Sequence, residues 1–152
     1  MLILALFSAL VSCGGGDAVF SYCELRIPLT EDFSEVKNEN FDVTYSNGDY
    51  AVAILRVSFV AAVKEGIPET LSASEFGEVW LEKCKRDANI INGDIAYSEY
   101  YDDAGGAEYF YLEAFYRSPY AYFVVLFTTV SELEEAGRVD FLKFANDVTF
   151  KT

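Results

Sequence analysis

Carboxylates are the only abundant acid–base side chains in this sequence. It holds 25 Asp and Glu against 11 Lys and Arg, and it has no histidine. Without histidine the chain cannot build a Ser-His-Asp or Cys-His catalytic unit, or the usual imidazole zinc site. The G-x-S-x-G nucleophile motif and the G-x-x-x-x-G-K phosphate loop are also missing. Any catalysis would therefore have to rest on carboxylates.

Adjacent carboxylates occur at Glu31-Asp32, Asp102-Asp103 and Glu134-Glu135. A glycosidase needs two carboxyl groups that face each other across a cleft, whereas neighbours in a turn or at a helix start point in different directions. We therefore expect solvated acids and no enzyme, with a carboxylate-dependent cell-envelope enzyme as one alternative. Asp102 and Asp103 precede two glycines and are weak calcium candidates, because calcium takes oxygen ligands. A calcium-stabilised surface protein is the other alternative; we expect no metal and no cofactor.

The two later cysteines, Cys23 and Cys84, are candidates for a disulfide if the chain is exported. Such a bond would close a loop of about 60 residues and stabilise the fold by roughly 4 kcal/mol in the chain-entropy model. Cys84 follows Trp80 by one helical turn and Cys23 alternates with Leu25, so both are expected to face a core. Two buried thiols fit these positions equally well, and no CxxC spacing suggests a redox or metal role.

Tyrosine is unusually dense in the second half of the chain. Along a strand expected over residues 107–117, Tyr109, Tyr111, Glu113 and Arg117 share one face. Tyrosines mixed with a pair of opposite charges are typical of binding surfaces, so these four residues are the candidate binding patch. The alternative is that a helix covers this face and only the phenol tips reach water.

Arg56 lies in the middle of an apolar strand expected over residues 50–59. A charge in such a place needs a partner. Glu113 is the candidate partner if the two strands are neighbours.

The start of the chain predicts a targeting signal. Residues 1–12 carry no charge and are almost wholly apolar, but they fall far short of the roughly 20 residues that span a bilayer. This composition suits the core of a signal peptide, and the residues Leu10-Val11-Ser12-Cys13 resemble the lipobox of bacterial lipoproteins. The resemblance implies cleavage before Cys13, acylation of that cysteine, and a domain held on a bacterial cell membrane outside the cytoplasm. Residues 13–20 would then be the lipidated cysteine and a flexible tether; a buried N-terminal strand or helix is the alternative.

The rest of the chain, residues 21–152, predicts a single domain with strands and helices in mixed order. Asn47-Gly48 between two β-rich runs indicates a hairpin, and Ser72 with Glu75 forms a capping box. A second capping box is expected at Ser131 and Glu134. The expected strands cover 22–28, 41–45, 50–59, 95–101, 107–117, 120–130 and 148–150, and the expected helices cover 73–86 and 131–146, with a loop over 60–71 and a turn over 102–106.

Antiparallel strands that are apolar on both faces imply an α+β fold with three α/β/α layers, a sheet of about six mostly antiparallel strands and helices on both faces. The order of elements resembles the Mog1/PsbP-like fold, including small bacterial lipoproteins of the PsbP-like and DUF1795 type. The resemblance lies in Leu25-Arg26-Ile27-Pro28, the Asn47-Gly48 hairpin, the helix start from Ser72 to Trp80, and residues 141–150. It implies no shared catalytic residues, since members of that family serve as accessory or binding proteins.

The charge balance narrows the class of partner. A formal charge of −14 argues against nucleic acid, whose phosphates require Lys and Arg. It favours a basic partner, or simply keeps the protein soluble. We therefore expect a membrane-anchored extracytoplasmic lipoprotein that acts as a non-catalytic binding or accessory module. Its partners would be the membrane, through Cys13, and an envelope protein or small ligand.

Overall fold

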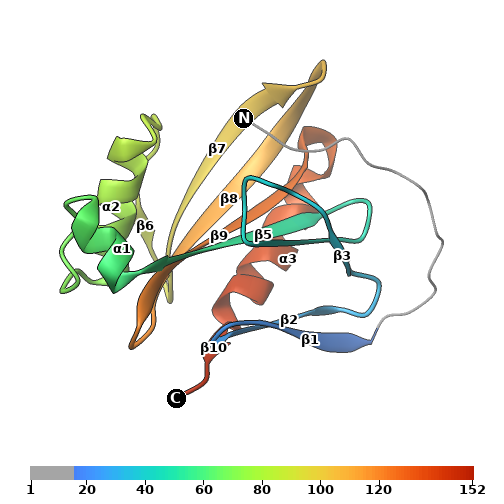
Figure 1. Ribbon diagram of the computed structural model, residues 1–152. Coiled ribbons are helices and arrows are strands. Elements are labelled where there is room, and N and C mark those ends of the chain that lie inside the picture. The colour runs from blue at the N-terminus through green and yellow to red at the C-terminus, as the bar shows by residue number, and fades with distance from the viewer. Residues whose placement is uncertain (1–15) are drawn as a thin grey trace.

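The computed structural model describes residues 16–152 (Figure 1). The expected signal peptide and the lipidation site Cys13 lie outside these residues. Asp17–Phe20, expected as part of the tether, are instead the start of the first strand. The folded domain therefore begins about four residues earlier than the sequence indicated.

A seven-stranded sheet forms the middle of the domain, in the order β3-β4-β5-β9-β8-β7-β6. Every neighbouring pair in it is antiparallel. Its strands are β3 (Ser34–Val36), β4 (Val43–Ser46), β5 (Ala51–Ser58), β6 (Ile91–Asn92), β7 (Ala96–Ala104), β8 (Ala107–Arg117) and β9 (Ala121–Val130). Short connections between β7, β8 and β9 give the expected meander. A second sheet has the order β1-β2-β10, from β1 (Asp17–Tyr22), β2 (Leu25–Thr30) and β10 (Thr149–Phe150).

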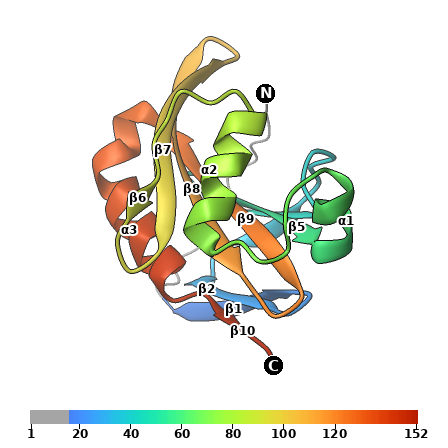
Figure 2. The same cartoon turned by 90° about the vertical axis from the view of Figure 1, so that its left-hand side faces the viewer.

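Helices cover both faces of the large sheet (Figures 1 and 2). On one face lie α1 (Phe59–Lys64) and α2 (Ala73–Lys83), and on the other lie η1 (Ser131–Leu133), α3 (Glu134–Asn146) and the small sheet. This arrangement confirms the predicted α+β sandwich. Its central sheet has seven strands instead of about six, and the first strands of the chain form the separate small sheet.

Successive side chains of β8 point to opposite faces of the large sheet, so this strand contributes to the hydrophobic core on each face. Phe110 and Leu112 are fully buried against α3 and the small sheet, whereas Phe115 is buried against α2. The neighbouring strand β9 is buried on both faces, as its uninterrupted apolar sequence predicts. Gly77 lets α2 come close to the sheet, since a Cβ there would lie 2.7 Å from the Phe115 ring.

Local signals placed several elements correctly. Asn47-Gly48 connects β4 to β5, with Gly48 at a φ of 96° that favours glycine. The capping box at the start of α2 is present, with Ser72 accepting from the Glu75 backbone amide and Glu75 accepting from that of Ser72.

Four predicted details are wrong. The strand expected over 22–28 is broken by a turn at Cys23, whose φ is 49°, so Tyr22 ends β1 and Leu25 begins β2. Residues 60–64, expected as part of a loop, and Phe59, expected as the end of a strand, instead form helix α1. No side chain caps α3, because Ser131 starts a 3₁₀ turn ahead of it. The turn expected over 102–106 is narrower, with Asp102 and Asp103 inside β7.

Candidate functional site

The face of the large sheet that carries α2 is covered unevenly. Near α2 the sheet residues join the helix in one core cluster. The hairpin of β7 and β8 extends past the end of α2 in both views (Figures 1 and 2). There, Ala53, Tyr111 and Leu126 form a small separate cluster with the half-buried Phe41, Tyr100 and Tyr109. Among the described residues, none from α1 or α2 belongs to that cluster.

We call Tyr100, Tyr109 and Tyr111 the tyrosine face. Tyr100 and Tyr111 are directly opposite each other in the β7–β8 register, and their rings stack with centroids 4.9 Å apart. Tyr109 lies at 6.4 Å from Tyr111 in a tilted arrangement. Burial raises the pKa of both Tyr100 and Tyr111 above the ordinary phenol value. The phenols of Tyr100 and Tyr111 therefore stay protonated and neutral at physiological pH.

Glu113 lies next to the tyrosine face and is only 3% exposed. It follows Tyr111 on the same face of β8, and it is paired in register with Ser98 of β7. Burial raises the pKa of its carboxyl group, and the Arg86 guanidinium, 3.8 Å away, offsets that effect in part. The surroundings of Glu113 therefore disfavour the charged form of its carboxyl group.

Several buried polar atoms around Glu113 have no hydrogen-bond partner in the described part of the chain. They are Glu113 Oε1, Arg86 Nε and the Ser98 hydroxyl. The Trp80 indole lies beside them, and its hydrogen bond lowers the pKa of Glu113. Ser98 is 0% exposed, so its hydroxyl does not contact bulk solvent. Buried polar groups are normally paired, and unsatisfied ones are costly. This cluster thus offers two donors and a carboxylate acceptor with unused bonding capacity.

Arg86 connects the buried carboxylate to the tyrosine face. Its guanidinium carbon lies 3.9 Å from the centroid of the Tyr100 ring, a close cation–π contact. The residue follows the end of α2, where its backbone amide donates to the Leu81 carbonyl at 2.9 Å. Lys85, just before it, has a φ of 53°, a left-handed conformation that side chains disfavour.

The structure brings together only part of the predicted binding patch. Tyr109, Tyr111 and Glu113 are neighbours along β8, with Tyr111 and Glu113 buried. Arg117 lies at the far end of the strand, where it donates to the Glu69 carbonyl at 2.9 Å and covers the Phe59 ring at 4.9 Å. The charged residue that faces Glu113 is Arg86, which was not part of the predicted patch.

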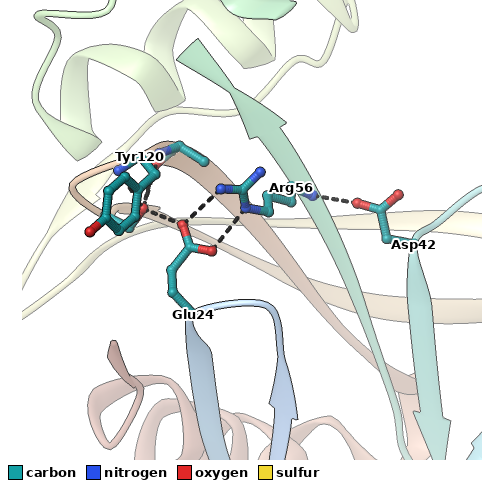
Figure 3. A network of polar contacts seen from close by, with 6 residues as sticks. Glu24, Asp42, Arg56 and Tyr120 are labelled. Carbon is teal, nitrogen blue, oxygen red and sulfur yellow. Dashed lines mark hydrogen bonds and ion pairs between the residues drawn. The ribbon is translucent and has the colours of Figure 1, made fainter. Parts of the chain in front are cut away.

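The predicted pairing of Arg56 with Glu113 is wrong, because β9 lies between β5 and β8. Arg56 instead donates to both carboxylate oxygens of Glu24, at 2.9 and 3.2 Å. Figure 3 shows Glu24 rising from the β1–β2 turn to meet Arg56 beside the turn that carries Tyr120. The Ser118 hydroxyl donates to Glu24 at 2.6 Å. Burial alone would raise the pKa of Glu24, but these hydrogen bonds outweigh it and lower the pKa.

The two later cysteines do not face a core. Cys23 lies in the β1–β2 turn and Cys84 caps the end of α2, and both are exposed free thiols. They lie on elements that cover opposite faces of the large sheet, and the structure contains no bond between them. Cys23 differs from the expectation because the turn takes it out of the strand alternation.

The acidic residues do not assemble a metal site. Asp102 and Asp103 are successive residues of a strand, so their side chains point to opposite faces. Among residues 16–152, no group of three or more Asp, Glu, Cys or His side chains is placed to hold a metal ion. Glu134 is engaged with Arg138 and Tyr101.

Sequence reasoning missed Tyr100, Trp80 and Arg86 as members of this site. Tyr100 could have been found by pairing the two strands back from the Gly105-Gly106 turn, which places it opposite Tyr111. Trp80 was assigned to the core stripe of a helix, which is also true. Arg86 gives no local signal, since its position depends on how α2 ends.

Comparison with solved structures shows a PsbP-like fold. The solution structure of cyanobacterial PsbP (CyanoP) from Synechocystis sp. PCC 6803 matches with a TM-score of 0.54 and 12% identity, covering 93% of this chain and 99% of that one. A crystal structure from Bacteroides thetaiotaomicron matches with a TM-score of 0.55 and 12% identity over 91% of this chain. This chain spans 49% of that Bacteroides protein. No family model and no curated protein sequence matches.

None of the helices among residues 16–152 has the length and apolar character needed to cross a bilayer.

Proposed function

We propose that this protein is a non-catalytic binding module that docks a basic segment of an envelope protein on the tyrosine face. The observation that carries the proposal is the cluster of Tyr100, Tyr109 and Tyr111 on the part of the sheet beyond α2. Tyrosine is enriched at protein interfaces because its ring provides apolar area and its hydroxyl a polar tip. The half-buried Tyr100 and Tyr109 offer both to a partner.

Charge selects the kind of partner. The chain has a formal charge of −14, so a basic partner is attracted over a distance. Asp102, which is exposed, lies on the same face of the β7–β8 hairpin as the tyrosines, and Glu113 lies beneath them. Aromatic ring faces also attract cations, especially guanidinium groups. The tyrosine face therefore combines apolar area with negative potential, which suits a segment that contains arginine.

The site favours binding over hydrolysis. Two-carboxylate catalysis requires a second acid across a cleft from the first. The charged group that acts on Glu113 is Arg86, and the other polar neighbour that affects its pKa is Trp80. Glu113 therefore has the raised pKa of a general acid without the partner that the reaction needs. This difference leads us to propose a binding role.

We further propose that Cys13 anchors the domain to a bacterial membrane. Because β1 begins at Asp17, only Gly14, Gly15 and Gly16 separate it from that cysteine. A fully extended chain covers about 3.5 Å per residue, so the four steps along the chain from Cys13 to Asp17 reach roughly 14 Å. The start of β1 would lie close to the bilayer, and the acyl chains would supply the membrane affinity.

Site-specific photocrosslinking tests the docking proposal. Tyr109 is replaced by p-benzoylphenylalanine in the full-length chain, produced in its own cells, and adducts are identified by mass spectrometry. We expect one dominant adduct that maps to a segment rich in Arg or Lys. Tyr120, which is 56% exposed on the β8–β9 turn, is the matched control and should not give that adduct. Equal adducts at both positions, or an adduct to an acidic protein, would contradict the proposal.

The anchor is tested by metabolic labelling with a palmitate analogue. We expect label on the wild-type protein and none on Cys13→Ala, with the variant uncleaved. A Cys23→Ala variant controls for acylation of an exposed thiol, and it should keep the label. If Cys13→Ala were labelled and membrane-bound like the wild type, the lipoprotein reading would fail.

A further inference from the structure

We infer that Tyr100 and Glu113 form a guanidinium-binding site, which the chain's own Arg86 occupies until an arginine of the partner displaces it. The inference rests on the proposed docking function and names the chemical group that is recognised. Arg86 shows that a guanidinium fits, because it lies 3.9 Å from the Tyr100 ring centroid and 3.8 Å from Glu113. A planar cation that stacks on an aromatic ring and faces a carboxylate is the geometry that arginine favours.

Arg86 occupies the site imperfectly. Its contact with Glu113 is longer than a hydrogen bond, and both Arg86 Nε and Glu113 Oε1 have no partner among the described residues. Other arginines of the same chain show what a complete pair looks like. Arg138, for example, holds the two oxygens of Glu99 at 2.8 and 3.3 Å. Arg86 therefore does not make the two-point contact with Glu113 that a guanidinium forms with a carboxylate in a complete pair.

The buried polar atoms near Glu113 that lack hydrogen-bond partners distinguish this place from ordinary surface and point to a ligand site. Glu113 is 3% exposed and Ser98 is fully buried, yet each has a polar atom without a partner in the described part of the chain. A guanidinium has five N–H donors, so it could satisfy the free carboxylate oxygen and the Ser98 oxygen together. The gain in hydrogen bonds would favour the exchange of one arginine for another.

Arg86 also has a place to go. It lines a pocket of about 440 Å³ beside α2, together with Glu78 and Glu82 of that helix. Rotation of its side chain into this pocket would keep the cation next to carboxylates. Displacement of Arg86 therefore costs little charge pairing.

The test is a titration of the full-length chain with a tetra-arginine peptide, followed by tryptophan fluorescence. Trp80 is the single tryptophan of the chain and its indole N–H lies in the cluster, so the signal reports on this site. We expect tetra-arginine to bind at least tenfold more tightly than tetra-lysine, because lysine lacks the planar fork. Arg86→Gln should bind tetra-arginine about tenfold more tightly than the wild type, and Glu113→Gln should not bind.

Arg117→Gln is the matched control, because it removes the same charge from the same face of the sheet outside the site. It should leave the affinity for tetra-arginine unchanged. If Arg86→Gln gained no more affinity than Arg117→Gln, Arg86 would be a structural residue and the inference would be wrong. Arg86→Lys tests the same point if the glutamine variant does not fold, and an intermediate gain is expected. The proposed function and this inference can fail separately. If crosslinking at residue 109 still gave the basic adduct but substitution of Arg86 did not change the affinity for tetra-arginine, the inference would be wrong and the proposed function would stand.

Discussion

Two buried carboxylates of this protein, each facing one arginine, have opposite surroundings. Glu24 is 9% exposed and receives hydrogen bonds from Arg56 on both oxygens and from Ser118 on one. Glu113 is 3% exposed, stands 3.8 Å from Arg86 and keeps one oxygen without a partner. The pKa of the first is lowered and the pKa of the second is raised.

The contrast distinguishes a carboxylate that stabilises the fold from a carboxylate that can still bind a ligand. Around Glu24 the bonding capacity is used up, and the bonds join the β1–β2 turn to β5 and to the β8–β9 turn of the large sheet (Figure 3). Around Glu113 it is left unused, at the edge of the tyrosine face. A complete network stabilises a fold, whereas an incomplete one is a place where a ligand can gain bonds. Four changes would break or sharpen this distinction.

Glu24→Ala should have the largest effect on stability. It leaves the Arg56 guanidinium without its partner and removes the ion pair that joins the β1–β2 turn to β5. We expect a loss of about 3 kcal/mol in the free energy of unfolding, below the full cost of a buried pair because Arg56 is 25% exposed. Urea denaturation measures it, with the exposed Glu39→Ala as control. A loss under about 1 kcal/mol would show that the network is not structural.

Ser118→Ala should have the next largest effect. The buried Ser118 hydroxyl donates to Glu24 and accepts from the backbone amides of Tyr120 and Ala121. Its loss leaves those amides without an acceptor, so we expect a destabilisation of about 1–2 kcal/mol in the same urea measurement. The apparent pKa of Glu24 should also rise, because one of the bonds that lower it is gone. An unchanged pKa would place the cause of the shift in Arg56 alone.

Glu113→Gln should change how stability depends on pH. Because the folded protein raises the pKa of Glu113, wild-type stability from this group is present at low pH and falls as pH rises through its ordinary value of 4.5. Glutamine does not titrate, so the free energy of unfolding of the variant should increase relative to that of the wild type as pH rises from about 4 to 7. Glu24 has the opposite sign, and its contribution is lost as pH falls. A gap between variant and wild type that stays constant with pH would contradict the raised pKa.

Ser98→Ala should have the smallest effect, and in the opposite direction to Ser118→Ala. Its hydroxyl is buried without a partner among residues 16–152, so removing it relieves an unsatisfied group. We expect a change between zero and about 1 kcal/mol toward greater stability, measured by thermal and urea unfolding. A clear destabilisation would mean that the hydroxyl is bonded in solution, and that the cluster around Glu113 is more complete than the structure shows.

The fold was predictable where a few neighbouring residues decide the outcome. Asn47-Gly48 fixed a hairpin and Ser72 with Glu75 fixed the start of α2, since both signals act within four residues. The turn at Cys23 was not predictable, because a left-handed residue other than glycine leaves no compositional mark. The α+β sandwich followed from the order of elements, and the separate small sheet did not.

The site was predictable only along one strand. Tyr109, Tyr111 and Glu113 follow from the alternation of β8. Partners from elsewhere depend on the order of strands, which the sequence does not state. Inserting β9 between β5 and β8 sends Arg56 to Glu24 and leaves Glu113 to Arg86.

The edges of the large sheet have a consequence for how this protein meets others. The outermost strands, β3 and β6, are three and two residues long. Such short strands give an incoming strand few backbone groups to pair with, so strand addition is disfavoured at β3 and at β6 themselves. Because β6 pairs only with Ala96 and Tyr97, residues 98–104 of β7 keep an outer edge without a strand neighbour in the described part of the chain. Backbone pairing by an extended segment is therefore left open along the outer end of β7, beside the tyrosine face.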